Sequence, residues 1–193
     1  MNIAATSVGG MVNNVKTFAS VLMSGVVHMR HTNLPDHTLI KGKPKTGADM
    51  PEDLERICMK FGSENIAACI IEPVAGSTGK LVPPKGYLTR SRELCAKHGI
   101  ILIFVELISL RIKQGGAQSL FGVMPDITCM GKIIGGGLPI GAVGGKRELM
   151  QLFSPEIANP VMHASTFSGN ALTMSAGLPA MKAFDDKECN RIN

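Results

Sequence analysis

Residues 100–105 read IILIFV, and this unbroken apolar run decides the fold, because such runs are typical of strands inside parallel sheets. A second run, IAACII at residues 66–71, has the same character. Between the two runs, residues 86–98 have the spacing of an amphipathic helix, which Gly99 closes. A strand, a helix and a strand in this order predict an α/β fold with a mainly parallel sheet, buried on both faces by flanking helices.

Further elements are expected on both sides of this unit. Residues 49–61 are predicted to form a helix, with Pro51 near its start and Gly62 at its end. Residues 126–130 (DITCM) are predicted to be a third strand, and residues 146–153 a further helix.

The segments towards the two ends are less regular. Residues 1–48 are rich in Gly, Asn and Thr and are expected to be irregular, with a turn at residues 34–36. Residues 170–184 are predicted to form a helix that Pro179 kinks or ends. The whole chain, residues 1–193, is expected to form one domain, because its length suffices for one sizeable core.

Composition and charge narrow the functional classes. Hydrophobic residues make up 45% of the chain and charged residues 18%, as in globular proteins. The formal net charge is +5, but the Lys and Arg residues are scattered and no basic run is interleaved with aromatics, which disfavours a nucleic-acid partner. The excess of positive charge suits small anionic molecules, including phosphates.

The five cysteines form no C-x-x-C pair and no zinc-type spacing with histidine, so no metal site is predicted. An odd number of cysteines, mostly inside apolar runs, indicates reduced thiols and a cytoplasmic location. No apolar stretch approaches about 18 residues, and the N-terminus has no secretory pattern, so no membrane partner is expected.

Ligands of open α/β sheets bind at the carboxyl ends of the strands, which directs attention to the residues after each run. These residues are Glu72, Pro73, Glu106, Leu107, Gly131 and Lys132. Lys132 stands between an apolar strand and the glycines at 135–137, so it is expected to be partly desolvated and nucleophilic towards carbonyl groups. A phosphate-binding lysine and an ordinary solvated lysine are the alternatives.

Spacing excludes two nucleotide-binding motifs around this lysine. A P-loop would need a glycine at the position of Asp126. A dinucleotide fingerprint starting at Gly135 would need a small residue at the position of Ile140.

Four stretches carry a resemblance to a known family. IIEPVAG at residues 70–76 and STGKLVPPKGYL at residues 77–88 resemble ω-amino acid:pyruvate aminotransferases. Residues 115–149, which contain GKIIGGGLPIG, and STFSGNALTMSAGL at residues 165–178 resemble glutamate-1-semialdehyde 2,1-aminomutases. Both groups are class III aminotransferases on the fold-type I scaffold, so the resemblance implies an enzyme that uses pyridoxal 5′-phosphate.

The resemblance also implies roles for individual residues. Lys132 matches the lysine that forms a Schiff base with the cofactor and moves protons between the substrate Cα and cofactor C4′. Thr166 matches a threonine that binds the cofactor phosphate across a homodimer interface, and Leu107 replaces a valine that packs on the pyridine ring. Glu72 belongs to a Glu-Pro segment near the site. A capping threonine, a core leucine and a solvated loop acid are the alternatives.

The chain departs from the family pattern at Val105, which occupies the place of the aspartate that pairs with the pyridinium nitrogen. That carboxylate keeps the ring protonated, and valine cannot do so. Glu106 is expected to point to the opposite face of the strand, because side chains alternate, and is therefore a poor substitute. The turn at residues 108–111 is one residue shorter than in the family.

The resemblance further implies that the chain is truncated at both ends and lacks a small C-terminal domain. It implies amino transfer between an amine or ω-amino acid and a keto acid or aldehyde, with activity impaired by Val105 and by the truncation. The alternatives are a non-catalytic remnant of the family, an isomerase of the aminomutase type, and an unrelated α/β phosphate-binding protein.

Overall fold

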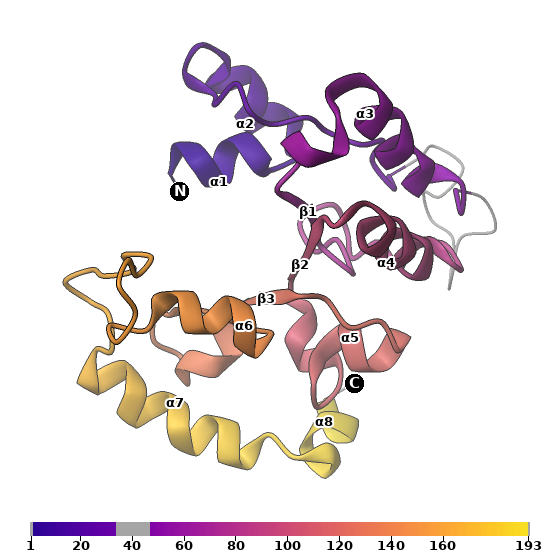
Figure 1. Ribbon diagram of the computed structural model, residues 1–193. Coiled ribbons are helices and arrows are strands. Elements are labelled where there is room, and N and C mark those ends of the chain that lie inside the picture. Colours follow the sequence, from indigo (N-terminus) through magenta and orange to yellow (C-terminus); the bar gives the residue numbers. More distant parts are fainter. Residues whose placement is uncertain (1, 34–46, 193) are drawn as a thin grey trace.

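In the computed structural model, residues 2–33 and 47–192 are described, so the turn expected at residues 34–36 lies outside the described residues. Within these ranges one sheet has the order β1 (Ala68–Ile71), β2 (Ile101–Val105), β3 (Ile127–Gly131) and β4 (Gly141–Gly145). The first three strands run parallel and β4 runs antiparallel to β3. The predicted α/β fold with a mainly parallel sheet is confirmed (Figure 1).

The four predicted helices are present, and the structure adds α1, α2, α5 and α8, which were not predicted, with short 3₁₀ turns between the elements. The α-helices are α1 (Ile3–Val8), α2 (Val12–Thr17), α3 (Asp53–Phe61), α4 (Tyr87–His98), α5 (Gly116–Phe121), α6 (Arg147–Met150), α7 (Ala171–Ala183) and α8 (Asp186–Ile192). The 3₁₀ turns are η1 (Ala19–Val21), η3 (Met50–Glu52), η4 (Ser63–Asn65), η5 (Ser109–Ile112), η6 (Lys132–Gly135) and η7 (Gln151–Phe153). Gly62 and Gly99, with φ of 79° and 68°, end α3 and α4 as predicted.

The core lies between the sheet and the pair α3 and α4. Leu102 and Phe104 of β2 are fully buried there. The alternate residues Ile103 and Val105 are only half-buried, and Ile70, which pairs with Ile103 on the same face, is 43% exposed. The expectation of strands buried on both faces is therefore wrong, because the described elements leave the second face partly open to solvent.

Asp126, immediately before β3, contacts α4, β2 and the residue that follows β4 through its carboxylate. Its carboxylate accepts hydrogen bonds from the Leu102 amide at 2.7 Å and from Arg92 at 2.7 Å, and lies 2.8 Å from Lys146 Nζ. Burial raises the pKa of this carboxyl, but the hydrogen bonds from Lys146, Leu102 and Arg92 outweigh burial and hold the pKa below its ordinary value. The ionised carboxylate thus fixes α4 and β2 against the β3–β4 pair.

The structure contradicts parts of two expectations about the ends of the chain. Residues 1–48 are not irregular throughout, because α1 and α2 form there and Asn2 caps α1 by accepting a hydrogen bond from the Ala5 amide at 2.8 Å. Pro179 does not end α7, which continues to Ala183. Packing of α7 on the η6 turn at Gly177, before the proline, and burial of Phe184, after the helix, hold the helix together.

All five cysteines lie in the described residues and form no disulfide with one another, and four of them are buried. No helix in the described part of the chain has the length and apolar character needed to cross a membrane.

Candidate functional site

Lys132 follows β3 directly and begins the η6 turn, so the predicted position at a strand end is confirmed. Its backbone φ is 52°, and in the described residues only Lys80 shares a positive φ without being a glycine. This left-handed conformation costs a residue with a side chain about 1–2 kcal/mol. Such conformations gather at functional sites, where the surrounding structure holds them in place.

The η6 turn is held against α7 by close backbone contacts. A Cβ atom on Gly136 would collide with the Ala176 carbonyl oxygen, and one on Gly177 would collide with the Ile134 carbonyl oxygen. Only glycine permits this approach of helix and turn. Helix α7 therefore fixes the backbone that carries Lys132.

A hollow of about 410 Å³ lies at the carboxyl ends of β2 and β3, and Lys132 is one of the residues that line it. The hollow is lined by Leu107, Ile108, Arg111, Lys132 and Ile133. Lys132 itself is exposed, so the expectation that it is partly desolvated is wrong for this chain. The apolar residues line the walls of an open hollow and do not enclose the amine.

Leu107 lies beside the lysine, over Gly131. A Cβ atom on Gly131 would lie 3.4 Å from Leu107 Cγ and 3.2 Å from the Ile140 carbonyl oxygen, so glycine makes room for both. The structure thus brings together Lys132 and Leu107, two of the residues selected from the sequence.

Val105 and Glu106 point in opposite directions, as alternation predicts. Val105 is half-buried and pairs with Cys129 of β3. Glu106 is fully buried, and its carboxylate accepts hydrogen bonds from the amides of Ala117 at 2.6 Å and Gln118 at 2.9 Å. Glu106 therefore caps the first turn of α5, where a negative charge is favourable, and is not available to a ligand in the hollow.

Glu72 and Thr166 differ in their distance from this hollow. Glu72 is half-buried, and a Cβ atom on Gly76 would lie 3.4 Å from its Oε1 and against Ile108, one of the lining residues. Glu72 is therefore a neighbour of the hollow. Thr166 is exposed in a turn before α7 and does not line the hollow of its own chain.

Sequence reasoning missed Arg111, which lines the hollow together with Lys132. The signal was present in the shortened turn at residues 108–111, where the arginine follows an apolar strand end.

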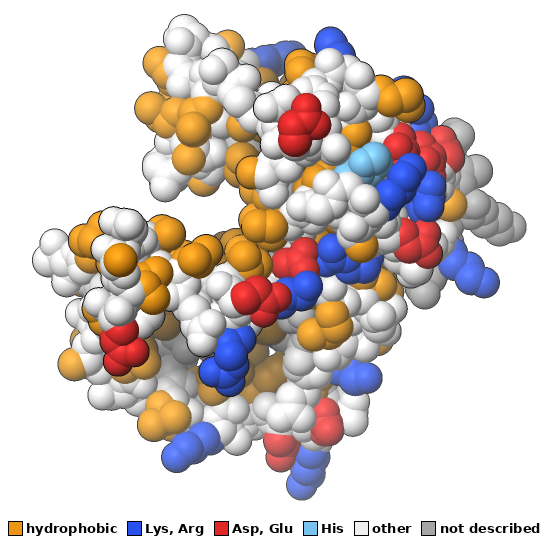
Figure 2. All heavy atoms as spheres, viewed as in Figure 1, with side chains coloured by type: hydrophobic (Ala, Val, Ile, Leu, Met, Phe, Trp, Pro, Cys, Tyr) orange, Lys and Arg blue, Asp and Glu red, His pale blue; other side chains and the backbone are white. Residues whose placement is uncertain are grey.

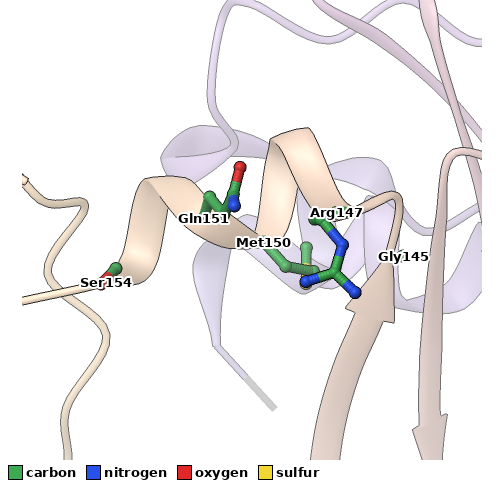
Figure 3. A pocket seen from close by; sticks show the side chains of 5 residues that line it. All are labelled: Gly145, Arg147, Met150, Gln151 and Ser154. Carbon is green, nitrogen blue, oxygen red and sulfur yellow. The ribbon is translucent and has the colours of Figure 1, made fainter.

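A second hollow of about 410 Å³ lies near the amino end of β3, away from the strand end that carries Lys132 (Figure 3). Arg147, Met150, Gln151 and Ser154 line it beside Gly145. Gly145 pairs with Ile127 at the amino end of β3, whereas Lys132 follows the carboxyl end. This second hollow therefore lies away from the residues selected for chemistry.

The mainly parallel sheet with an antiparallel edge strand, and the lysine in a left-handed turn at the end of β3, define a piece of the fold-type I transferase scaffold. The chain belongs to the class III aminotransferases, since the model of the family "Aminotransferase class-III" matches residues 2–191. This is a family of pyridoxal-phosphate-dependent enzymes.

Two curated relatives represent two branches of the family. The omega-aminotransferase of Caulobacter vibrioides is 42% identical over 188 residues, which are 94% of this chain and 43% of the relative. The glutamate-1-semialdehyde 2,1-aminomutase of Desulforamulus reducens is 54% identical over 132 residues, which are 68% of this chain and 30% of the relative. The chain thus spans less than half the length of these relatives.

Solved structures of transaminases match the fold of this chain. The omega transaminase of Pseudomonas jessenii in complex with PMP matches 97% of this chain and 42% of its own with a TM-score of 0.81 at 25% identity. An omega-transaminase of Sphaerobacter thermophilus matches 69% of this chain and 31% of its own with a TM-score of 0.65 at 46% identity. The predicted fold and family are confirmed.

Proposed function

We propose that this chain binds pyridoxal 5′-phosphate through Lys132 and forms the cofactor-binding part of a transaminase. The observation that carries the proposal is the left-handed Lys132 at the end of β3, which faces the same hollow as Leu107. A fixed primary amine beside apolar walls suits an aldehyde on a flat ring. The chain corresponds, in this proposal, to part of the large domain, residues 1–193.

The residues present fit most of the cofactor. Lys132 would hold it covalently, Leu107 would pack on the ring, and Glu72 would border the site. Thr166 of a second copy would bind the phosphate. When bound, the cofactor supplies a ring that withdraws electrons from the substrate. The amine of Lys132 would then move a proton at the substrate Cα.

Val105 is the one position that does not fit. It offers no carboxylate to the ring nitrogen, so the ring would be a poorer electron acceptor. We therefore infer that the chain transfers amino groups slowly or not at all, between an amine or ω-amino acid and a keto acid or aldehyde. A non-catalytic role that keeps cofactor binding is the alternative.

An isomerase of the aminomutase type is a second candidate, because identity to an aminomutase reaches 54% over 132 residues. The match to an omega-aminotransferase covers more of the chain, at 94%, and favours amino transfer.

We also propose a homodimer. Thr166 is exposed, and the following Phe167 and the α7 residues Leu172 and Leu178 are 76%, 70% and 60% exposed. Figure 2 shows that apolar side chains also gather elsewhere on the surface of this chain. Apolar side chains in such numbers favour association. The free cysteines support the proposal of a cytoplasmic location.

Absorbance spectroscopy tests the proposed cofactor binding. Adding pyridoxal 5′-phosphate to the wild-type chain should produce a visible band that is absent after Lys132→Ala and present after Lys113→Ala, an exposed control. A band of equal strength in the Lys132→Ala protein would refute the proposal.

A further inference from the structure

We propose that the hollow beside Lys132 selects a substrate with an apolar, uncharged side chain, and that Ile108 and Ile133 contact this side chain. The substrate class is then an alkyl or aryl amine, or the matching aldehyde. This inference rests on the proposed function and narrows it, because it favours such an amine over an ω-amino acid, which carries a carboxylate as well.

The walls of the hollow are apolar and accessible. Leu107, Ile108 and Ile133 line it, and each is half-buried, so each still presents surface to solvent. A ligand that covers this surface removes apolar area from water, which is favourable in proportion to the area. The volume of about 410 Å³ lies within the range of small-molecule pockets, about 300–1,000 Å³. The lining therefore favours an apolar group next to the amine of Lys132.

The two isoleucines are held in place before a ligand arrives. A Cβ atom on Gly76 would collide with Ile108 Cδ1, so the Ile108 side chain rests directly on the backbone of the loop after β1. Ile133 lies in the η6 turn, where its carbonyl oxygen accepts a hydrogen bond from the Gly136 amide at 3.3 Å. Isoleucine is also stiff about its first side-chain torsion. The apolar surface is thus preformed, and little entropy is lost when a ligand covers it.

The three apolar residues divide between the cofactor and the substrate. In the proposed function Leu107 packs on the cofactor ring. Ile108 and Ile133, which follow Leu107 and Lys132 in the chain, remain for the group that the substrate brings.

The carboxylate of an ω-amino acid finds a poorer environment in this hollow. Against Ile108 and Ile133 it would lose water without gaining a hydrogen bond, which is unfavourable. Arg111 also lines the hollow, but it is exposed and already takes part in an interaction within the chain. An apolar side chain needs no such partner, so the same walls favour it.

Reductive trapping on Lys132 tests this preference without any measurement of activity. The full chain is incubated with an aldehyde and cyanoborohydride, and the modified Lys132 peptide is quantified by mass spectrometry. The matched aldehydes are 4-methylpentanal and 4-oxobutanoate, which have similar length and shape but end in an isopropyl group and a carboxylate. Labelling of the exposed Lys113 in the same digest corrects for the intrinsic reactivity of each aldehyde.

Paired variants separate the polarity of the walls from their size. Ile108→Thr and Ile133→Thr make a wall polar, whereas Ile108→Val and Ile133→Val give side chains of the same size that stay apolar. Ile157→Thr is the distant control, because Ile157 is 37% exposed and does not line the hollow. Ethanal, which is too short to reach the walls, reports whether the amine of Lys132 is itself unchanged in each variant.

We expect the wild-type chain to trap 4-methylpentanal at about tenfold lower concentration than 4-oxobutanoate, since each buried methylene contributes up to about fourfold. Either threonine variant should reduce this preference about threefold. The valine variants and Ile157→Thr should keep most of it, and trapping of ethanal should not change.

Equal trapping of the two aldehydes, or a preference for 4-oxobutanoate, overturns the inference, and the second result assigns the hollow to ω-amino acids. An unchanged preference in both threonine variants overturns it as well, because the selection then has another source. In these cases the proposed function stands as long as pyridoxal 5′-phosphate labels Lys132. If pyridoxal 5′-phosphate labels Lys132 no more than Lys113, the proposed function fails first, and the inference with it.

Discussion

Val105 of β2 pairs directly with Cys129 of β3, and Lys132 follows Cys129 by three residues in the chain. A neutral, half-buried valine therefore stands on the strand next to the lysine, at the position where the family resemblance implies an aspartate. The buried Glu106 cannot replace that aspartate, because it binds the amides of Ala117 and Gln118 on the other side.

The substitution Val105→Asp should strengthen binding of pyridoxal 5′-phosphate about tenfold, because a hydrogen bond between charged groups is worth roughly 1.5–3 kcal/mol. It should not restore full transfer activity. Val105→Asn is the matched control, since it has the same shape as aspartate without the charge. Titration of the visible band with pyridoxal 5′-phosphate measures the affinity of both variants for the cofactor. Equal affinity of the Asp and Asn variants would contradict the assignment of this position.

Asp126→Asn should lower the free energy of unfolding by about 2 kcal/mol at pH 7. This is less than for a fully buried pair, because Lys146 is 54% exposed. The folded-state pKa of Asp126 lies below its ordinary value, so its contribution is present above about pH 4 and is lost as the pH falls further. The difference between wild type and variant should shrink in acid.

Urea unfolding at several pH values measures this difference. Glu188→Gln, which removes an exposed pair with Arg191, is the control and should leave the unfolding midpoint unchanged. A constant difference between wild type and Asp126→Asn from pH 7 to pH 3 would show that the carboxylate charge contributes nothing.

Gly177→Ala should lower the stability by about 1–3 kcal/mol, because the added methyl group collides with the Ile134 carbonyl oxygen and pushes α7 off the η6 turn. Gly141→Ala is the matched control, since nothing lies within 4 Å of its Cβ position. Thermal melts compare the two. Equal melting temperatures would mean that α7 does not hold the lysine turn.

The chain should sediment as a dimer or a larger species at micromolar concentration. Leu178→Glu should shift it towards monomer, because this residue is 60% exposed on α7. Met59→Glu, at a position on α3 that is 77% exposed, should have no effect. Analytical ultracentrifugation gives the answer, and a wild-type monomer at all concentrations would remove the dimer-based role of Thr166.

Much of the fold was predictable because its elements are marked locally. The apolar runs mark the bounds of β1 and β2, and the glycines mark the ends of α3 and α4, to within a few residues. Strand β4 was not predicted, because its sequence GAVGG has few strand-favouring side chains and it is held by pairing with β3. The open second face was not predictable either, since apolar strands look alike whether or not a layer covers them.

Some residues of the candidate site were predictable from the sequence and others were not. Lys132 and Leu107 follow apolar runs, so topology alone placed them at the sheet edge. Arg111 lies in a short turn whose course depends on contacts with Glu106 and Cys189. Neither contact can be read from the sequence around the arginine, because the second comes from a distant helix. The exposure of Lys132 likewise depends on which parts of the fold surround it.

The central claim is that Lys132 alone holds the cofactor, and peptide mapping tests it most directly. The chain is incubated with pyridoxal 5′-phosphate, reduced with borohydride and digested, and the pyridoxyl group is located by mass spectrometry. We expect a label on Lys132, at the left-handed turn after β3, and no comparable label on other lysines, the exposed Lys80 and Lys113 included. A label spread evenly over several lysines, or absent from Lys132, would contradict it.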